Sequence, residues 1–204
     1  LCTLAFYRAR TLETTCWART IGRSTNIVCE GELLQNEASG NFDLSRAQYL
    51  RIIDAKTAEL CACCCNLGAH YAGGDKKTVA SLESFGRHLG IAFQIADDLL
   101  DLEGDEAVTG KSLGTDLAKQ KMTLPLIYLR DSLNAAEREK LRHLVAEPGG
   151  ELLTWLDESG ALDHARDVAL AHSQLAEEEL ASLPDSPAKE ALLTTCQFVT
   201  RRSA

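Results

Sequence analysis

The chain has little proline and few aromatic residues: four prolines occur in 204 residues, and Phe, Trp and Tyr together make up 5%. Proline is the strongest helix breaker, whereas Ala, Leu and Glu, which are abundant here, are strong helix formers. This composition favours an all-helical protein. With 45% hydrophobic and 25% charged residues, the chain has ordinary globular composition and enough length for one large domain with a substantial core.

The chain also lacks an excess of basic residues. It carries 21 Lys and Arg against 30 Asp and Glu, a net charge of −9. Without a basic stripe to neutralise phosphates, nucleic acid is excluded as an expected partner. An anionic small molecule would still bind if a cation or a local basic cluster accompanied it.

No apolar run approaches the roughly 18 residues that a transmembrane helix needs, and no secretory signal pattern is present. We therefore expect no transmembrane segment. The first residue is Leu1 rather than methionine. We expect that the sequence begins inside a longer protein or covers only the ordered part of one.

Cysteine is unusually frequent, with eight residues, four of them at Cys61 and Cys63–Cys65. Neighbours this close on one helix have poor geometry for disulfides. A zinc site would require a second C-x₂-C pair beyond Cys61 and Cys64, or more nearby histidines than His70. We interpret the cysteines as small apolar side chains at a tight helix contact, in a reducing cytoplasm.

Helix signals follow one another along the chain, and no segment shows the alternation of a strand. Capping boxes are expected at Ser45 with Gln48 and at Asn134 with Glu137, and Ser186 is expected to cap a helix that Pro187 opens. Helices are predicted at residues 2–20, 22–38, 46–71 with a break near Asp54, 75–103, 125–133, from 135, 150–158, 160–182 and 187–202, with a polar loop at 104–120. The predicted fold is a single all-α domain over residues 1–204, a large helical bundle.

Three aspartates interrupt the apolar pattern of the helix predicted at residues 75–103. Asp97 and Asp101 are one turn apart and share a face that Gln94 joins, whereas Asp98 projects about 100° away from Asp97. Carboxylates at this spacing repel each other, and a buried unpaired charge is costly. Mg²⁺ would compensate, since it takes one or two carboxylates, keeps waters and bridges to substrate phosphates. The alternative is a solvated acidic end of a helix.

Lysines in two further segments suit a diphosphate next to such a metal. The loop after the aspartates contains Lys111 and Lys121 among glycines. The segment DAKTAEL, residues 54–60, places Lys56 and Thr57 on an otherwise apolar helix. Taken alone, that lysine is better explained as a surface residue with a buried stem, but the combined pattern favours a site for a diphosphate and a metal.

Five segments, in this order, resemble the trans-type polyprenyl diphosphate synthases, a family of head-to-tail prenyltransferases. They are CEGELLQ (29–35), KTAEL (56–60), GRHLGIAFQIADDLLD (86–101), GKSLGTDLAKQKMTLPLI (110–127) and FVTRR (198–202). The resemblance extends over essentially the whole chain. It implies an all-α isoprenoid-synthase bundle around a central cavity, usually a homodimer.

The resemblance also implies a reaction and its residues. Family members ionise an allylic prenyl diphosphate, add isopentenyl diphosphate to the resulting carbocation and remove a proton, with three Mg²⁺ ions. Asp97 would be the principal ligand of one Mg²⁺, with Asp98 and Asp101 in support. Diphosphate binding would fall to Lys56, Lys111 and Lys121. Thr57 and Gln94 would line the reaction centre, with Phe93 near isopentenyl diphosphate.

The sequence departs from the family pattern in one respect. The family has two aspartate-rich motifs on facing helices, and only the second is present here. We expect the first, with the arginine pair after it, to lie upstream of Leu1, so that roughly the N-terminal third is missing. A protein of these 204 residues alone would then have negligible synthase activity.

Two other functions fit part of the pattern. A class I terpene cyclase would share the fold and the ionisation step, but residues 134–182 contain no evident Asn/Ser/Glu metal triplet. A regulatory subunit of a heteromeric prenyl synthase would not need the intact aspartate motif.

Overall fold

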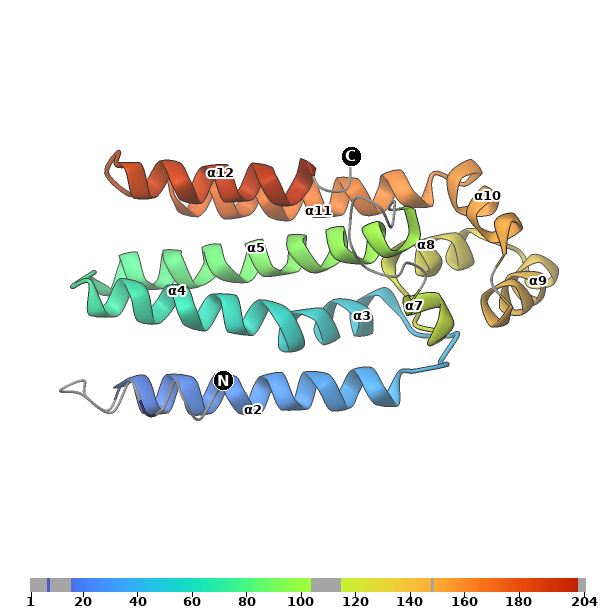
Figure 1. Ribbon diagram of the computed structural model, residues 1–204, viewed down its shortest axis with the longest axis horizontal. Helices are drawn as coiled ribbons and strands as arrows, with labels where there is room; N and C mark the ends of the chain where they lie inside the picture. The colour runs from blue at the N-terminus through green and yellow to red at the C-terminus, as the bar shows by residue number, and fades with distance from the viewer. Residues whose placement is uncertain (1–6, 8–15, 104–114, 148, 202–204) are drawn as a thin grey trace.

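The computed structural model describes residues 7, 16–103, 115–147 and 149–201, and these residues form helices and the turns between them (Figure 1). In chain order the helices are α2 (Cys16–Glu37), α3 (Arg46–Ile53), the π-helix η1 (Asp54–Ala58), α4 (Glu59–Tyr71), α5 (Lys76–Glu103), α7 (Thr115–Ala118), α8 (Leu124–Ser132), α9 (Ala135–Ala146), α10 (Gly150–Glu158), α11 (Ala161–Glu179) and α12 (Pro187–Arg201). No strand occurs in these described ranges. The predicted all-α class is confirmed.

Helix α5 is the central element of the bundle. It packs against α4 and α11, and Figure 1 shows α2 on the outer side of α4 and α12 beside α11. Its position follows from its sequence, because apolar or small residues recur on most of its faces; Ile95 and Leu99, for example, are fully buried. Helices α8, α9 and α10 gather at one end of the bundle (Figure 1). None of the described helices combines the length and hydrophobicity that a membrane span requires.

Most helix ends follow the predicted caps. Both capping boxes form, at Ser45 with Gln48 and at Asn134 with Glu137. Asp75 caps α5, since its carboxylate accepts a hydrogen bond from the Thr78 N–H at 2.7 Å. These local side-chain bonds satisfy backbone N–H groups that a helix start leaves without partners.

Three predictions of local structure need correction. The break predicted between residues 20 and 22 is wrong, because α2 runs without interruption through Gly22, where nothing crowds the backbone. The break near Asp54 is a π-helical turn that keeps the chain helical from α3 into α4. The part of the predicted loop that the structure describes includes the short helix α7.

Helix α5 approaches η1 and α4 closely through small residues. A Cβ atom added to Gly90 would lie 2.6 Å from the Cα of Ala58, and one added to Gly86 would lie 2.5 Å from the Cys61 carbonyl oxygen. Cys65 packs beside Gly86 within a small apolar cluster, and burial raises the pKa of its thiol to about 11. This environment agrees with the interpretation of Cys65 as a packing residue, since a raised pKa keeps a thiol neutral. For Cys64 the interpretation is wrong, because that residue is exposed.

Replacing Gly90 with alanine is expected to lower the free energy of unfolding by roughly 1–3 kcal/mol, because the added methyl group meets backbone atoms that cannot move aside cheaply. Gly68→Ala is the matched control: Gly68 lies in α4 and has nothing within 4 Å of an added Cβ. There the better helix propensity of alanine should stabilise the protein by up to about 1 kcal/mol. Urea denaturation measures both, and equal stability of the two variants would contradict this packing.

Candidate functional site

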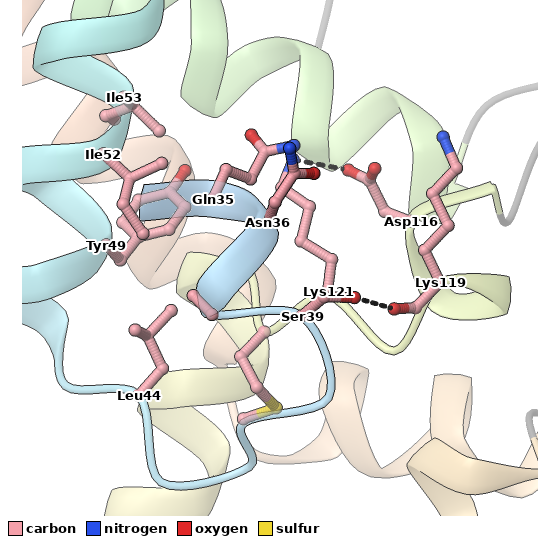
Figure 2. Close-up of a pocket in the computed structure, with 12 residues that line it drawn as sticks. Gln35, Asn36, Ser39, Leu44, Tyr49, Ile52, Ile53, Asp116, Lys119 and Lys121 are labelled. Carbon is pink, nitrogen blue, oxygen red and sulfur yellow. Dashed lines mark hydrogen bonds and ion pairs between the residues drawn. The ribbon is translucent and has the colours of Figure 1, made fainter. Parts of the chain in front are cut away.

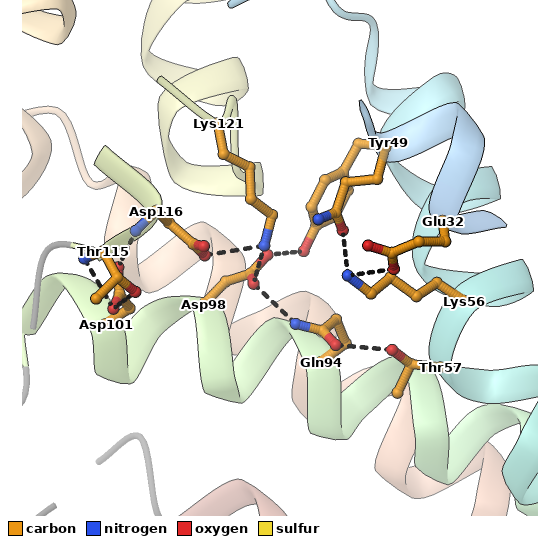
Figure 3. A network of polar contacts seen from close by, with 11 residues as sticks. Glu32, Tyr49, Lys56, Thr57, Gln94, Asp98, Asp101, Thr115, Asp116 and Lys121 are labelled. Carbon is orange, nitrogen blue, oxygen red and sulfur yellow. Dashed lines mark hydrogen bonds and ion pairs between the residues drawn. The ribbon is translucent and has the colours of Figure 1, made fainter. Parts of the chain in front are cut away.

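Three predicted site residues of α5, Gln94, Asp98 and Asp101, point toward residues of η1, α3 and the segment around α7 (Figure 3). Figure 3 shows a continuous series of polar contacts from Thr57 through Gln94, Asp98 and Lys121 to Asp116. These contacts join three segments that lie far apart in the sequence: η1, α5 and the segment from α7 to Lys121. Three of the motifs identified separately in the sequence therefore meet at one place.

Asp98 lies at the centre of these contacts and is 1% exposed. One carboxylate oxygen accepts hydrogen bonds from Lys121 Nζ at 2.8 Å and Gln94 Nε2 at 2.9 Å. The other accepts one from the hydroxyl of Tyr49 at 2.7 Å. Burial raises the pKa of Asp98, although the charge of Lys121 acts to lower it. Asp98 is therefore held within the protein by three donors.

Lys121 contacts two carboxylates, Asp98 and Asp116, each at 2.8 Å. Its partial burial disfavours its charge, but these two carboxylates outweigh that effect and raise its pKa. Lys121 is thus a permanent cation at this position. In the described structure its direct partners are carboxylates, and its predicted contact with a diphosphate remains a prediction.

Asp101 links α7 to α5 through hydrogen bonds. Its carboxylate accepts hydrogen bonds from the N–H and hydroxyl of Thr115, at 3.2 and 2.9 Å, and from the N–H of Asp116 at 2.8 Å. An anionic side chain suits the first turn of a helix, where backbone N–H groups have no partner in the helix. Asp101 thereby holds the segment that carries Asp116 and leads to Lys121.

Lys56 and Thr57 both reach other parts of the site. Lys56 Nζ contacts Glu32 Oε2 at 2.9 Å and Gln35 Oε1 at 3.1 Å, both on α2. The hydroxyl of Thr57 donates to Gln94 Oε1 at 2.8 Å. The amide of Gln94 donates to Asp98, one turn further along α5, at 2.9 Å.

A cavity of about 110 Å³ adjoins this network (Figure 2). Its polar wall includes Asp116, Lys119 and Lys121, and its apolar wall includes Ile52 and Ile53. Tyr49 lies beside Ile52, on the apolar side of the cavity (Figure 2). The cavity therefore offers an apolar space beside a charged group, which is the character of a site for an amphipathic molecule.

The donor set of α5 suits a hard cation only in part. Among the described residues, no three His, Cys, Asp or Glu side chains converge to hold a metal ion by themselves. Asp97 and Asp101 are partly exposed and one turn apart, whereas Asp98 is buried in its own contacts. Mg²⁺ fits Asp97, because it can bind through a single carboxylate and completes its shell with water and phosphate oxygens; the carboxylate of Asp101 already accepts hydrogen bonds from Thr115 and Asp116.

The structure does not test two of the predicted site residues. Lys111 lies outside the described residues. Phe93 is 38% exposed on α5, and the structure does not test its predicted contact with isopentenyl diphosphate.

Sequence reasoning missed Tyr49, Glu32 and Gln35. The last two belong to the quoted segment CEGELLQ but were given no role. Tyr49 had no local signal, because a tyrosine in an amphipathic helix is ordinarily a core residue. Only the fold brings its hydroxyl to Asp98.

Comparison with known proteins agrees with this geometry. A family profile described as Polyprenyl synthetase matches residues 1–152. The chain belongs to the polyprenyl synthetase family. Its relatives resemble this chain in sequence, and the solved structures that it matches resemble it in fold as well.

A short chain isoprenyl diphosphate synthase of Methanothermobacter thermautotrophicus is 36% identical over 179 residues, which are 86% of this chain and 55% of that protein. A decaprenyl diphosphate synthase structure from Rhodobacter capsulatus matches with a TM-score of 0.86 and 31% identity, over 94% of this chain and 61% of that one. A polyprenyl synthase from Caulobacter crescentus, solved with calcium and isoprenyl diphosphate, matches with a TM-score of 0.84 and 35% identity, over 94% and 60%. The chain thus spans less than two thirds of the length of each of these synthases.

Proposed function

We propose that the intact protein carrying this chain is a prenyltransferase that condenses isopentenyl diphosphate with an allylic prenyl diphosphate to give a longer polyprenyl diphosphate. The observation that supports it most strongly is the network from Thr57 to Lys121, which joins the aspartate helix, the Lys56 segment and the α7 segment in one site. Membership of the polyprenyl synthetase family supports the same reaction.

In this reaction the C–O bond of the allylic diphosphate breaks and the diphosphate leaves with the electron pair. The double bond of isopentenyl diphosphate then attacks the allylic cation, and a proton is lost as the new double bond forms. Charge accumulates on the leaving diphosphate, so fixed cations directed at it lower the barrier. Lys56 would supply such a charge, and Lys111 is proposed for the same role.

Thr57 and Gln94 would stabilise the positive charge of the allylic cation. The hydroxyl and amide oxygens of these two residues lie 2.8 Å apart, and fixed dipoles directed at a developing charge stabilise it. Phe93 would contact isopentenyl diphosphate. Lys121 would hold Asp98 and Asp116 in place and, with its remaining donor, bind the diphosphate.

Mg²⁺ is the proposed metal, with Asp97 as the principal ligand and Asp101 in support; once bound, it would neutralise the departing diphosphate. Asp98 and Asp101 would support the metal site mainly by positioning, since three protein donors already occupy each carboxylate. We also propose that the protein works in the cytoplasm as a homodimer and that this chain forms part of one domain.

Replacing Asp97 with alanine in the intact protein is expected to remove most of the Mg²⁺-dependent part of its affinity for an allylic diphosphate analogue, a loss of about 10- to 100-fold. Calorimetric titration with and without Mg²⁺ measures this, and circular dichroism checks that helicity is kept. Asp167→Ala, on α11, is the control and should leave binding as it was. Unchanged Mg²⁺-dependent affinity in Asp97→Ala would refute the metal assignment.

Transfer of labelled isopentenyl diphosphate onto farnesyl diphosphate tests the reaction itself. Transfer by the intact protein alone is the expected result. Transfer that occurs only after a catalytic partner is added would instead identify a regulatory subunit.

A further inference from the structure

The π-helix η1 is an irregular turn that carries two of the proposed site residues. Its wider turn closes where the N–H of Glu59 donates to the carbonyl of Asp54, five residues earlier. Lys56 and Thr57 lie between these two ends. Single π-helical turns inside α-helices are rare and occur frequently at functional sites. Because each residue advances an α-helix by about 100°, the extra residue changes the direction in which neighbouring side chains point.

Arg87 of α5 bridges both ends of this turn. Its guanidinium donates from Nη1 to Asp54 Oδ1 at 2.7 Å and from Nη2 to Glu59 Oε2 at 2.6 Å. The residues joined by the backbone bond of the turn are therefore also joined through one planar cation. A guanidinium suits this task better than an ammonium, because its donors have a fixed fork geometry.

The Glu59 end of the bridge is buried. Glu59 is 5% exposed, and its second carboxylate oxygen accepts a hydrogen bond from the hydroxyl of Ser24 on α2 at 2.7 Å. Both oxygens of this buried carboxylate therefore have donors, one from each neighbouring helix. A buried charge with complete hydrogen bonding fixes local geometry strongly.

Two glycines allow the flanking helices to touch the backbone of the turn. A Cβ added to Gly31 of α2 would lie 2.6 Å from the backbone N of Lys56, and one added to Gly90 of α5 would lie 2.6 Å from the Cα of Ala58. The turn is thus held between two helices at its middle and by Arg87 at its ends.

We infer that Arg87 is a positioning residue for the proposed reaction: by clamping Asp54 and Glu59 it holds the π-helical turn in the register that directs Lys56 and Thr57 into the site. This inference rests on the proposed function. Arg87 does not contact the aspartates of α5 in the described structure; it acts through the turn.

The test uses the intact protein with inorganic pyrophosphate and Mg²⁺ as the probe. Arg87→Met keeps the apolar stem and removes both ion pairs. We expect amide hydrogen exchange in peptides across residues 54–59 to rise about 10-fold or more, and affinity for the probe to fall about 10-fold. Arg87→Lys retains a charge but not the fork geometry, so its hydrogen exchange and its affinity should lie between those of the unsubstituted protein and Arg87→Met. It also provides a folded variant if Arg87→Met is unstable.

Arg142→Met is the matched control, because Arg142 also pairs with two carboxylates, Asp43 and Glu139, but at the α9 end of the bundle. It should change neither measurement. A double-mutant cycle separates positioning from general stabilisation: if Arg87 acts through Lys56, Arg87→Met should cost no further affinity once Lys56→Met is present.

The outcomes distinguish two kinds of failure. If the unsubstituted protein does not bind pyrophosphate with Mg²⁺, the proposed function fails, and the positioning role with it. If it binds but Arg87→Met changes neither exchange at 54–59 nor affinity, or if the two substitutions are additive, the positioning role alone is overturned.

Discussion

Replacing Lys121 with methionine is expected to lower the free energy of unfolding by about 3–5 kcal/mol, because it leaves the buried carboxylate of Asp98 without its cation. Asp98 is 1% exposed, so solvent cannot take over this role. Gln94 and Tyr49 still donate to it, but neither carries a charge. Chemical denaturation at neutral pH measures the loss.

The pH dependence of that loss identifies its cause. Burial already raises the pKa of Asp98, and Lys121 opposes this rise; without the lysine, the pKa of the folded state should rise further. A carboxyl group whose folded-state pKa exceeds its unfolded value favours folding at low pH and loses this contribution as pH rises through the folded pKa. The deficit of Lys121→Met should therefore shrink as pH falls through that range.

Two further variants complete this experiment. Lys140→Met removes a lysine that pairs with Glu151 at the surface, where the side chains are 54% and 50% exposed, and should cost no more than about 1 kcal/mol. Asp98→Leu combined with Lys121→Met removes both charges and should recover part of the stability. A deficit for Lys121→Met as small as that of Lys140→Met would show that the buried pair is not important for stability.

Replacing Lys56 with methionine in the intact protein is expected to lower kcat/KM for prenyl transfer by about 10²- to 10³-fold, the usual effect of removing one group that stabilises transition-state charge. Steady-state kinetics with labelled isopentenyl diphosphate measures it. Stability should change little, since Lys56 and Glu32 form a partly exposed pair, 33% and 51% accessible, and such pairs contribute at most about 1 kcal/mol.

Lys77→Met is the matched control for this kinetic prediction. Lys77 is an exposed lysine in the first turn of α5, far along the helix from the aspartates, and its loss should not affect turnover. Lys56→Arg should retain part of the activity, because it keeps the charge but changes its geometry. Activity of Lys56→Met within a few-fold of the unsubstituted protein would exclude Lys56 from the reaction.

The fold class, most helix ends and the family follow from the amino-acid sequence alone. Periodic apolar residues and capping pairs act within a few residues along the chain, so Ser45 with Gln48 and Asn134 with Glu137 could be identified before any tertiary contact was known. The five motifs and their order can also be read directly from the linear sequence, and the family match agrees with them.

The pairing of the charged residues, in contrast, depends on the tertiary fold. Periodicity placed Asp98 away from Asp97, but it could not tell that Asp98 is the buried member, bonded to Tyr49 from α3 and to Lys121. Nor could it find Arg87 bridging Asp54 and Glu59, although Glu59, like the aspartates, is an acidic residue in an apolar segment. These partners are separated by between 23 and 49 residues. Their pairing depends on how helices pack, and a local sequence pattern contains no information about that.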